Sequence, residues 1–277
     1  MSTTSAIFLN EALDVSRDVV VSFDYACYGQ AAQAGDGFCL WFTDITQFYS
    51  YAGGPGPGLG YCPVSGVNAW TGNSTYNGLA YGSLGIGFDI TGNFSVSSYC
   101  YNGYANPSPN TINIRSNYIN NYQLLYTSPT LSTFNTPVSL YQQVTGSPVY
   151  NRVRVRITDF GQRILIDMKE VLPDTPFTNY VDFTLPYNVF PPSLAAGLSF
   201  SSGLTSAQFK ITNFTINSFV PSIFTTTYTY SAASYFNMAP DPVTLTIYDI
   251  LSSTDGVLNI NAGGAPYTSG DGFVVIA

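Results

Sequence analysis

Histidine is absent from the 277-residue chain, and its absence removes several kinds of chemistry. No Ser-His or Cys-His pair can activate a nucleophile, and no imidazole can act as a base or bind a transition metal. Glutamate occurs only at Glu11 and Glu170, so no strand carries the clustered carboxylates that many glycosidases use. We therefore predict that the protein is not an enzyme; a hydrolase built on aspartates alone is the remaining catalytic alternative.

Positive charge is also scarce. The chain has 8 Lys plus Arg and a net charge of −8, and three of its arginines (152, 154 and 156) share one expected strand. No basic stripe can follow a phosphate backbone or an anionic membrane surface, so we predict no nucleic-acid partner. No apolar run approaches the ~20 residues that span a bilayer, so we predict no membrane insertion. The first residues carry no secretory signal pattern, which favours a removed signal or release by another route, such as assembly into a virus particle.

Cysteine is limited to four positions, Cys27, Cys39, Cys62 and Cys100, with no CxxC pair. Without histidine, this spacing excludes an ordinary zinc site. Cys27 and Cys39 could lie opposite each other on a hairpin. Disulfides and buried free thiols both remain open for all four.

The chain is instead rich in apolar and aromatic residues, at 45% and 16%, which is enough for a substantial core. Short segments alternate with a period of two between turn residues, as β-strands do. We predict an all-β fold with strands at 19–27, 38–43, 84–90, 111–116, 152–158, 163–168, 195–200, 209–219 and 243–250. The turn at 160–162 joins two of these strands into a hairpin.

The sequence texture changes after Val220. Residues 225–230 are rich in Thr and Tyr, Pro240–Pro242 breaks the chain, and the tail is rich in glycine. We predict a main sandwich over 1–220 and a β-rich C-terminal extension over 221–277.

Several segments, in order, resemble the L-type (legume-type) lectins. They are Gly35–Phe38 (GDGF), Gly53–Tyr61 (GGPGPGLGY), Gly87–Asn93 (GFDITGN), Asn151–Ile157 (NRVRVRI), Ala195–Gly203 (AAGLSFSSG) and Ile211–Ile216 (ITNFTI). The resemblance covers roughly residues 6–219. It implies a concanavalin A-like antiparallel β-sandwich, or jelly roll.

The resemblance also implies a carbohydrate site. It assigns sugar contacts to Asp36, to the amides of Gly58 or Gly60, and to Asn93. A carboxylate accepts from sugar hydroxyls, amides donate to them, and an aromatic face stacks on the ring. Tyr61, Phe94 or Tyr99 could supply that face. The alternatives are an ordinary turn at Asp36, loop flexibility at the glycines and core packing of the aromatics.

The same resemblance implies a calcium site at Asp89, the Thr91 carbonyl and Asn93. The family's strand glutamate is Gly87 here, and its later acidic ligand has only Asn106 as the nearest counterpart. One carboxylate is few for an ion that takes about six to eight oxygens. The alternative is that Asp89 and Asn93 cap a turn by side-chain hydrogen bonds.

These observations favour a non-catalytic carbohydrate-binding module for adhesion, with glycans as partners and an extracellular or virion-surface location. The alternative is a purely structural virion or filament subunit whose lectin-like scaffold does not bind sugar. In either case we expect self-association or other structural subunits. The chain also starts late relative to many family members, so the extension could supply a missing edge strand, in its own chain or in a neighbour.

Overall fold

A computed structural model shows the protein as two compact units, residues 1–216 and 217–277. The structure describes residues 3–8, 13–14, 18–29, 35–47, 52–64, 76–98, 100, 103–131, 138–144, 147–172, 174–191, 193–202, 207–220, 228–231, 242–245, 251–252, 260–262 and 265–267.

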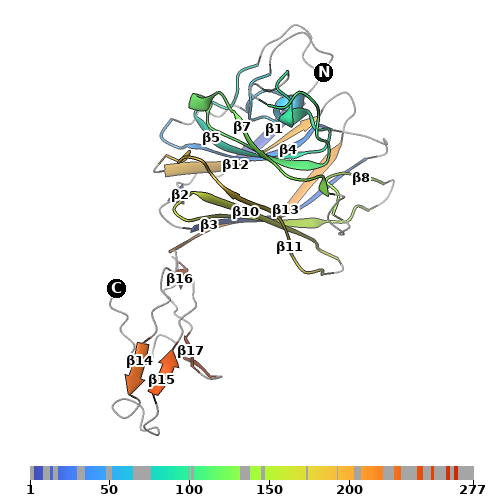
Figure 1. The fold of residues 1–277 in the computed structure, drawn as a ribbon. Coiled ribbons are helices and arrows are strands. Elements are labelled where there is room, and N and C mark those ends of the chain that lie inside the picture. The colour runs from blue at the N-terminus through green and yellow to red at the C-terminus, as the bar shows by residue number, and fades with distance from the viewer. Residues whose placement is uncertain are drawn as a thin grey trace. The chain divides into compact units, whose positions relative to one another are not determined.

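The first unit is a sandwich of two sheets (Figure 1). The front sheet has the order β1-β12-β4-β5-β6-β7, with β2 beside β12. Its strands are β1 (Thr3–Phe8), β2 (Leu13–Asp14), β4 (Gly37–Asp44), β5 (Gly82–Asp89), β6 (Thr111–Arg115), β7 (Leu124–Thr127) and β12 (Ser193–Ser202).

The back sheet has the order β11-β10-β9-β3-β13, with β8 parallel to β3. Its strands are β3 (Asp18–Gly29), β8 (Gln142–Gln143), β9 (Asn151–Thr158), β10 (Arg163–Glu170), β11 (Thr178–Thr184) and β13 (Gln208–Val220). Eight of the nine expected strands are therefore confirmed, and the ninth belongs to the C-terminal unit.

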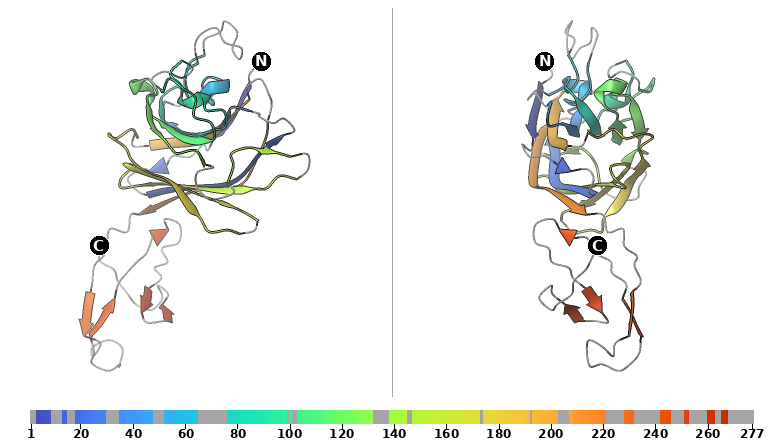
Figure 2. Two further views of the ribbon diagram at one scale, coloured as in Figure 1. Left: turned by 45° about the vertical axis from the view of Figure 1, so that its right-hand side comes forward. Right: turned by 90° about the vertical axis from the view of Figure 1, so that its left-hand side faces the viewer.

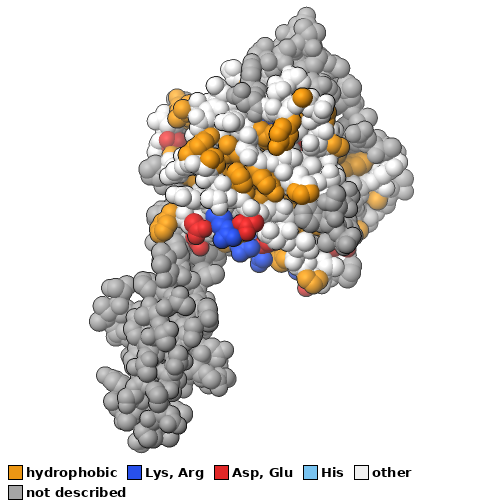
Figure 3. Space-filling model, in the orientation of Figure 1, with side chains coloured by type: hydrophobic (Ala, Val, Ile, Leu, Met, Phe, Trp, Pro, Cys, Tyr) orange, Lys and Arg blue, Asp and Glu red, His pale blue; other side chains and the backbone are white. Residues whose placement is uncertain are grey.

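The hairpin of β9 and β10 shows how alternation sets the two faces of the back sheet. Val153, Val155 and Ile157 are fully buried between the sheets. The intervening arginines point outward and are paired: Arg154 and Arg156 each lie 2.9 Å from the Asp167 carboxylate, and Arg152 binds Asp24 through two nitrogens. On the face seen in Figure 3, charged side chains gather at the level of this sheet.

Apolar side chains from the inner faces of both sheets form the main core. Phe38 on β4 stacks on Phe88 on β5 with ring centroids 4.5 Å apart, and Phe23 from the back sheet meets both rings edge-on. Burying a phenylalanine side chain contributes about 1.5–3 kcal/mol, so this cluster stabilises the stacking of the two sheets.

A second apolar cluster covers the outer face of the front sheet, where loops form a further layer (Figure 2). Its members come from β4, from the glycine loop (residues 53–60) and from the segments around it: Cys39, Trp41, Leu59, Tyr61, Cys62, Leu79, Phe94, Cys100 and Tyr122. We call it the outer cluster. Because neighbouring residues of a strand face opposite ways, β4 contributes Phe38, Leu40 and Phe42 to the main core and Cys39 and Trp41 to the outer cluster.

This arrangement rules out the hairpin on which Cys27 and Cys39 could have lain opposite each other. The strands β3 and β4 belong to different sheets, so they do not form a hairpin. Cys27 lies in the main core and Cys39 in the outer cluster, and all four cysteines are buried free thiols in this structure.

In its described residues, the second unit contains the end of β13 and five short strands. Phe219 and Val220 of β13 pair with β16 (Leu251–Ser252); β14 (Tyr228–Ser231) pairs with β15 (Pro242–Leu245), and β17 (Ile260–Ala262) with β18 (Ala265–Tyr267). β15 overlaps the start of the strand expected at 243–250, and residues 246–250 lie outside the described part. The supply of an edge strand by this extension stays a prediction. In the described part of the chain, no helix is long and apolar enough to cross a membrane.

Candidate functional site

The pairing of β4 with β5 places Asp36 beside the segment that follows Asp89. Gly37 pairs with Asp89, so the residue before Gly37 lies against the residues after Asp89. The Ile90 N–H donates to the Asp36 carbonyl at 2.9 Å, which fixes this approach. Gly37 has φ +143°, and a Cβ there would lie 2.2 Å from the Phe88 carbonyl oxygen, so the close approach requires glycine.

The Asp36 carboxylate contacts two of the other predicted site residues. Its Oδ1 accepts from Thr91 Oγ1 and from Asn93 Nδ2, each at 3.2 Å. The residue is only 1% exposed, whereas Thr91 and Asn93 are partly exposed. Among the described residues, Oδ2 is buried with no hydrogen-bond partner.

Burial raises the pKa of Asp36, and the bonds from Asn93 and Thr91 oppose that rise. A buried carboxylate oxygen without a donor costs free energy. A donor hydroxyl, a cation or a proton would each remove that cost.

Asp89 is fully buried at the end of β5. Its Oδ1 accepts from the Gly92 N–H at 2.8 Å, and its Oδ2 accepts from Asn113 Nδ2 at 3.1 Å. Burial raises the pKa of Asp89 to about 8, and the neighbouring charge of Asp36 adds to the rise. The Gly92 bond is the turn cap that was expected as the alternative to a metal site.

Asn113 is a member of this site that the sequence did not point to. It lies on β6 opposite Gly87, and Thr127 Oγ1 donates to its Oδ1 at 2.7 Å. That bond orients the amide so that its nitrogen faces Asp89. Asn106, the counterpart expected from the sequence, is exposed. Asn113 reaches Asp89 only through the pairing of β5 with β6. No sequence motif identifies Asn113, so the sequence alone could not predict its place in the site.

The donor set for a cation consists of two neighbouring carboxylates, Asp36 and Asp89, with the Thr91 carbonyl and Asn93 close by. Oxygen donors suit calcium, and a bound cation would favour the ionised form of both carboxylates. Among the described residues, no group of three or more acidic or thiol side chains comes together as a metal centre. A calcium ion held here would need water or ligand oxygens to complete its coordination.

The glycine loop lies against the outer face of the front sheet. The Gly60 N–H donates to the Gly54 carbonyl at 2.9 Å, so this amide is already used. The Gly58 N–H makes a longer bond of 3.4 Å to the Pro55 carbonyl, and both glycines are buried. Of the two predicted loop amides, the Gly58 N–H therefore makes the weaker hydrogen bond within the protein and is the more available to a ligand.

Tyr61 and Phe94 are 0% exposed, which corrects their expected role as stacking platforms. The Tyr61 ring packs on Gly85, and the Phe94 ring packs on Gly87. Tyr61 also donates its hydroxyl to the Ser116 carbonyl at 2.9 Å. Both rings fill the outer cluster and present no face to a ligand. Tyr99 lies outside the described residues.

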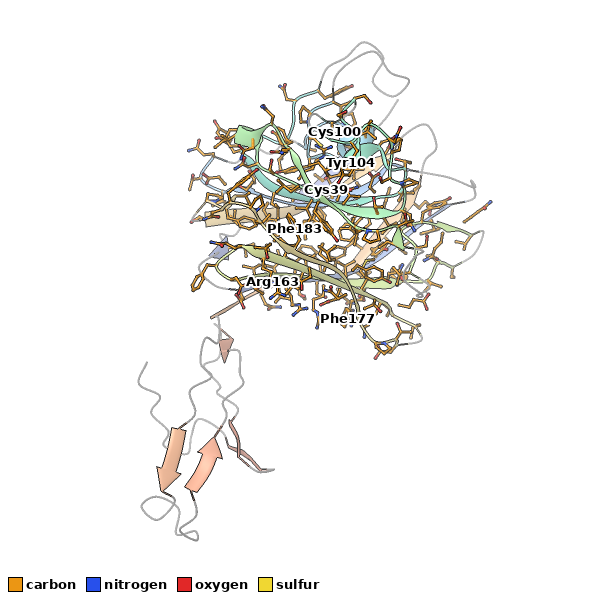
Figure 4. The ribbon with its side chains drawn as sticks, in the orientation of Figure 1. Cys39, Cys100, Tyr104, Arg163, Phe177 and Phe183 are labelled. Carbon is orange, nitrogen blue, oxygen red and sulfur yellow. The ribbon has the colours of Figure 1, made fainter. Side chains whose placement is uncertain are left out.

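Tyr104 is an exposed aromatic residue close to the Asn93 turn (residues 89–95). Its N–H donates to the Ser95 carbonyl at 2.8 Å, and the Ser97 N–H donates to its carbonyl at 2.8 Å. Its side chain is 52% exposed, and Figure 4 shows it on the same side of the sandwich as Cys100. The sequence contains 22 tyrosines, and nothing in the pattern distinguishes this one.

Arg115 holds the loops of this region together from beneath. It is fully buried and donates to the carbonyls of Phe94 at 2.8 Å, Tyr122 at 2.7 Å and Cys100 at 3.4 Å. Its guanidinium also lies 5.2 Å from the centre of the Phe94 ring. These bonds position the backbone that carries Asn93.

No protein-family model matches the sequence, and a search of curated proteins finds no match. Among solved structures, lectin II from Ulex europaeus is similar over 79% of this chain and 82% of its own, with 10% identity and a TM-score of 0.51. The structure of lectin UEA-II complexed with galactose is similar over the same shares, with 9% identity and a TM-score of 0.50.

A third match is the VIP36 exoplasmic/lumenal domain in its Ca²⁺/Man3GlcNAc-bound form. The match covers 88% of this chain and 83% of the VIP36 domain, with 16% identity. Its TM-score of 0.45 is too low to support an argument. The first two matches and the two sheets establish the fold: the first unit is a lectin-type β-sandwich, as the sequence predicts.

Proposed function

We propose that this lectin-fold protein binds a neutral glycan at Asp36, Thr91 and Asn93, without catalysis. The observation that carries the proposal is the buried Oδ2 of Asp36, which has no hydrogen-bond partner in the described part of the chain. A sugar hydroxyl that donates to this oxygen would satisfy it. Thr91 and Asn93, both partly exposed, line the approach and can exchange their bonds to Oδ1 for bonds to the ligand.

Tyr104 is the aromatic residue best placed to stack on the bound sugar ring. Its backbone is fixed on both sides by Ser95 and Ser97, so a ligand orders little further chain when it binds. The Gly58 amide is a further donor candidate. A calcium ion between Asp36 and Asp89 would favour the charged forms of both carboxylates and so help Asp36 to accept from the sugar.

The proposed site does not perform acid–base chemistry. Asp89 holds a proton near neutral pH, but it is fully buried and bonded to Gly92 and Asn113. A general acid must come within hydrogen-bond reach of the reacting group, and Asp89 does not reach a surface ligand. Galactose binding by a lectin of the same fold also favours a binding role. We also propose an extracellular location, where a glycan-binding protein would meet its ligands.

The second candidate function is a structural subunit that uses the scaffold without binding sugar. The burial of Asp36, Gly58, Gly60, Tyr61 and Phe94 favours it, because five of the six predicted sugar contacts are then not at the surface. A virion-surface role belongs to this candidate and to the first alike. Assembly of the purified chain into regular particles or filaments, with no glycan binding, would support it.

A glycan array probed with the full chain, in calcium and in a chelator, tests the proposed function. We expect binding to a defined set of neutral glycans. Asp36→Asn keeps the shape of the side chain but removes the charged acceptor, and we expect it to weaken binding at least tenfold. Asp182→Asn is the matched control, since that exposed carboxylate pairs with Arg163 on the back sheet.

An array without any bound glycan, in calcium and in chelator, would refute sugar binding. Equal binding by Asp36→Asn and the wild type would support sugar binding but would show that the site does not involve Asp36.

A further inference from the structure

Three of the four cysteines gather in the outer cluster, beneath the loops that carry the candidate site. Cys39, Cys62 and Cys100 are all 0% exposed there. Figure 4 shows Cys39 and Cys100 on the same side of the sandwich. Neither the proposed sugar site nor the fold requires these residues to be cysteine, since any small apolar side chain could fill the same space.

Cys62 and Cys100 are neighbours in this buried cluster, and Cys62 adds to the rise in the pKa of the Cys100 thiol that burial causes. The Cys100 thiol also donates to the Pro57 carbonyl at 3.1 Å, which holds its sulfur against the glycine loop. Cys62 follows the same loop: its N–H donates to the Gly58 carbonyl at 3.1 Å, and its carbonyl accepts from Gly54. Both cysteines are thus held against the glycine loop within one cluster.

The other two cysteines are held by different elements. Cys39 lies within β4, and its thiol donates to the Leu40 carbonyl at 3.5 Å. Cys27 lies on β3 within the main core between the sheets. Because only Cys62 and Cys100 are hydrogen-bonded to the glycine loop among the described cysteines, these positions favour the Cys62–Cys100 pairing.

We propose that Cys62 and Cys100 form a disulfide when the chain folds in the presence of a small-molecule disulfide such as oxidised glutathione. Two cysteine S–H bonds break and one S–S bond forms between the residues. The two electrons and two protons pass to glutathione, whose S–S bond breaks to give two thiols. The reaction runs through a mixed disulfide between one cysteine and glutathione.

The bond forms before the outer cluster closes. Burial raises the pKa of the Cys100 thiol in the folded protein, and the thiolate is the attacking species. A chain that has folded fully reduced would oxidise slowly, because the reagent must wait for local opening.

The cross-link would join the glycine loop to the segment after the Asn93 turn. It closes a loop of about 40 residues, and cross-links of that length stabilise a fold mainly by restricting the unfolded chain. The two 3₁₀ helices Gly56–Gly58 and Asn93–Ser95, which carry predicted ligand contacts, would then be tied together. The inference stands independently of sugar binding.

The test is to refold the full chain in a glutathione redox buffer, block free thiols with iodoacetamide and map the peptides. Chymotrypsin is the suitable protease, because no Lys or Arg lies between Arg17 and Arg115. We expect two blocked thiols, at Cys27 and Cys39, and one cross-linked peptide pair containing Cys62 and Cys100. Reduction should lower the melting temperature by about 10 °C.

Two variants provide the controls. Cys27→Ala should keep the cross-link and the effect of reduction, whereas Cys100→Ala should lose both. The peptide map of the wild type decides the question if Cys100→Ala fails to fold. Four blocked thiols in the refolded wild type, or a cross-link between Cys39 and Cys100, would overturn the proposal.

Discussion

Two neighbouring buried carboxyl groups, Asp36 and Asp89, set the electrostatics of the candidate site. Burial raises the pKa of both, and that of Asp89 rises to about 8. In the folded protein Asp89 therefore keeps its proton up to about pH 8, whereas in the unfolded chain it loses the proton near pH 4. Unfolding releases a proton between these values.

Stability should therefore fall as the pH rises from about 4 to about 8 and level off above that range. Asp89 alone contributes a slope of at most ~1.4 kcal/mol per pH unit. We expect Asp89→Asn to flatten the slope, measured as the free energy of unfolding in urea at pH 5, 6.5 and 8. The slope is the quantity to compare, because an amide at position 89 also changes the bond with Asn113.

Calcium provides the complementary measurement. Cation binding requires ionised carboxylates, so added calcium should raise the melting temperature more at pH 8 than at pH 6, and Asp89→Asn should abolish the effect. Identical slopes for Asp89→Asn and the wild type would contradict the assigned pKa. If calcium does not change the melting temperature, the calcium site is refuted, and turn capping remains as the role of the carboxylates.

At the scale of secondary structure, β5 shows why the loops can cover the front sheet. Gly85 and Gly87 alternate with Leu84, Ile86 and Phe88, which point into the main core, so the outer face of this strand carries few side-chain atoms. The rings of Tyr61 and Phe94 fill that space. A Cβ on Gly85 would lie 2.3 Å from the Tyr61 ring.

We therefore expect Gly85→Ala to destabilise the protein by ~1–3 kcal/mol, since an added methyl group overpacks the outer cluster. Urea unfolding measures the effect. Thr184→Ala, at an exposed position of β11, is the control and should stay within ~0.5 kcal/mol of the wild type. An equally small effect for Gly85→Ala would mean that the loops do not pack on β5 as described.

The strands that alternate cleanly or form short apolar runs could be predicted from the sequence, and those with weaker patterns could not. The segment 152–158 was predicted within one residue of β9 because Val, Ile and Arg alternate there. β1 (TTSAIF) and β11 (TNYVDFT) carry weaker patterns and were missed. The contact of Asp36 with Asn93 was implied by resemblance, whereas Asn113, Arg115 and Tyr104 reach the site through strand pairing and loop packing, which no local pattern records.

At the scale of the whole molecule, both apolar clusters lie within residues 1–216. A chain truncated after Val220 should therefore fold cooperatively and keep any glycan binding. If the extension supplies an edge strand, the truncated chain should also self-associate more than the full chain, because an unpaired strand edge attracts other chains.

Circular dichroism on heating and light scattering against concentration measure these two properties. A truncated chain that is soluble, monomeric and as stable as the full protein would refute the edge-strand hypothesis. A truncated chain that does not fold would show that the first unit depends on residues beyond Val220.

The most direct test of the account is a crystal structure of the full chain with calcium and the glycan that binds best on the array, or Man3GlcNAc if none binds. We predict density for a sugar with a hydroxyl within hydrogen-bond distance of the Asp36 carboxylate, with Asn93 and Tyr104 in contact with the same ring. A sugar bound elsewhere, or no sugar density beside Asp36, would contradict the central claim.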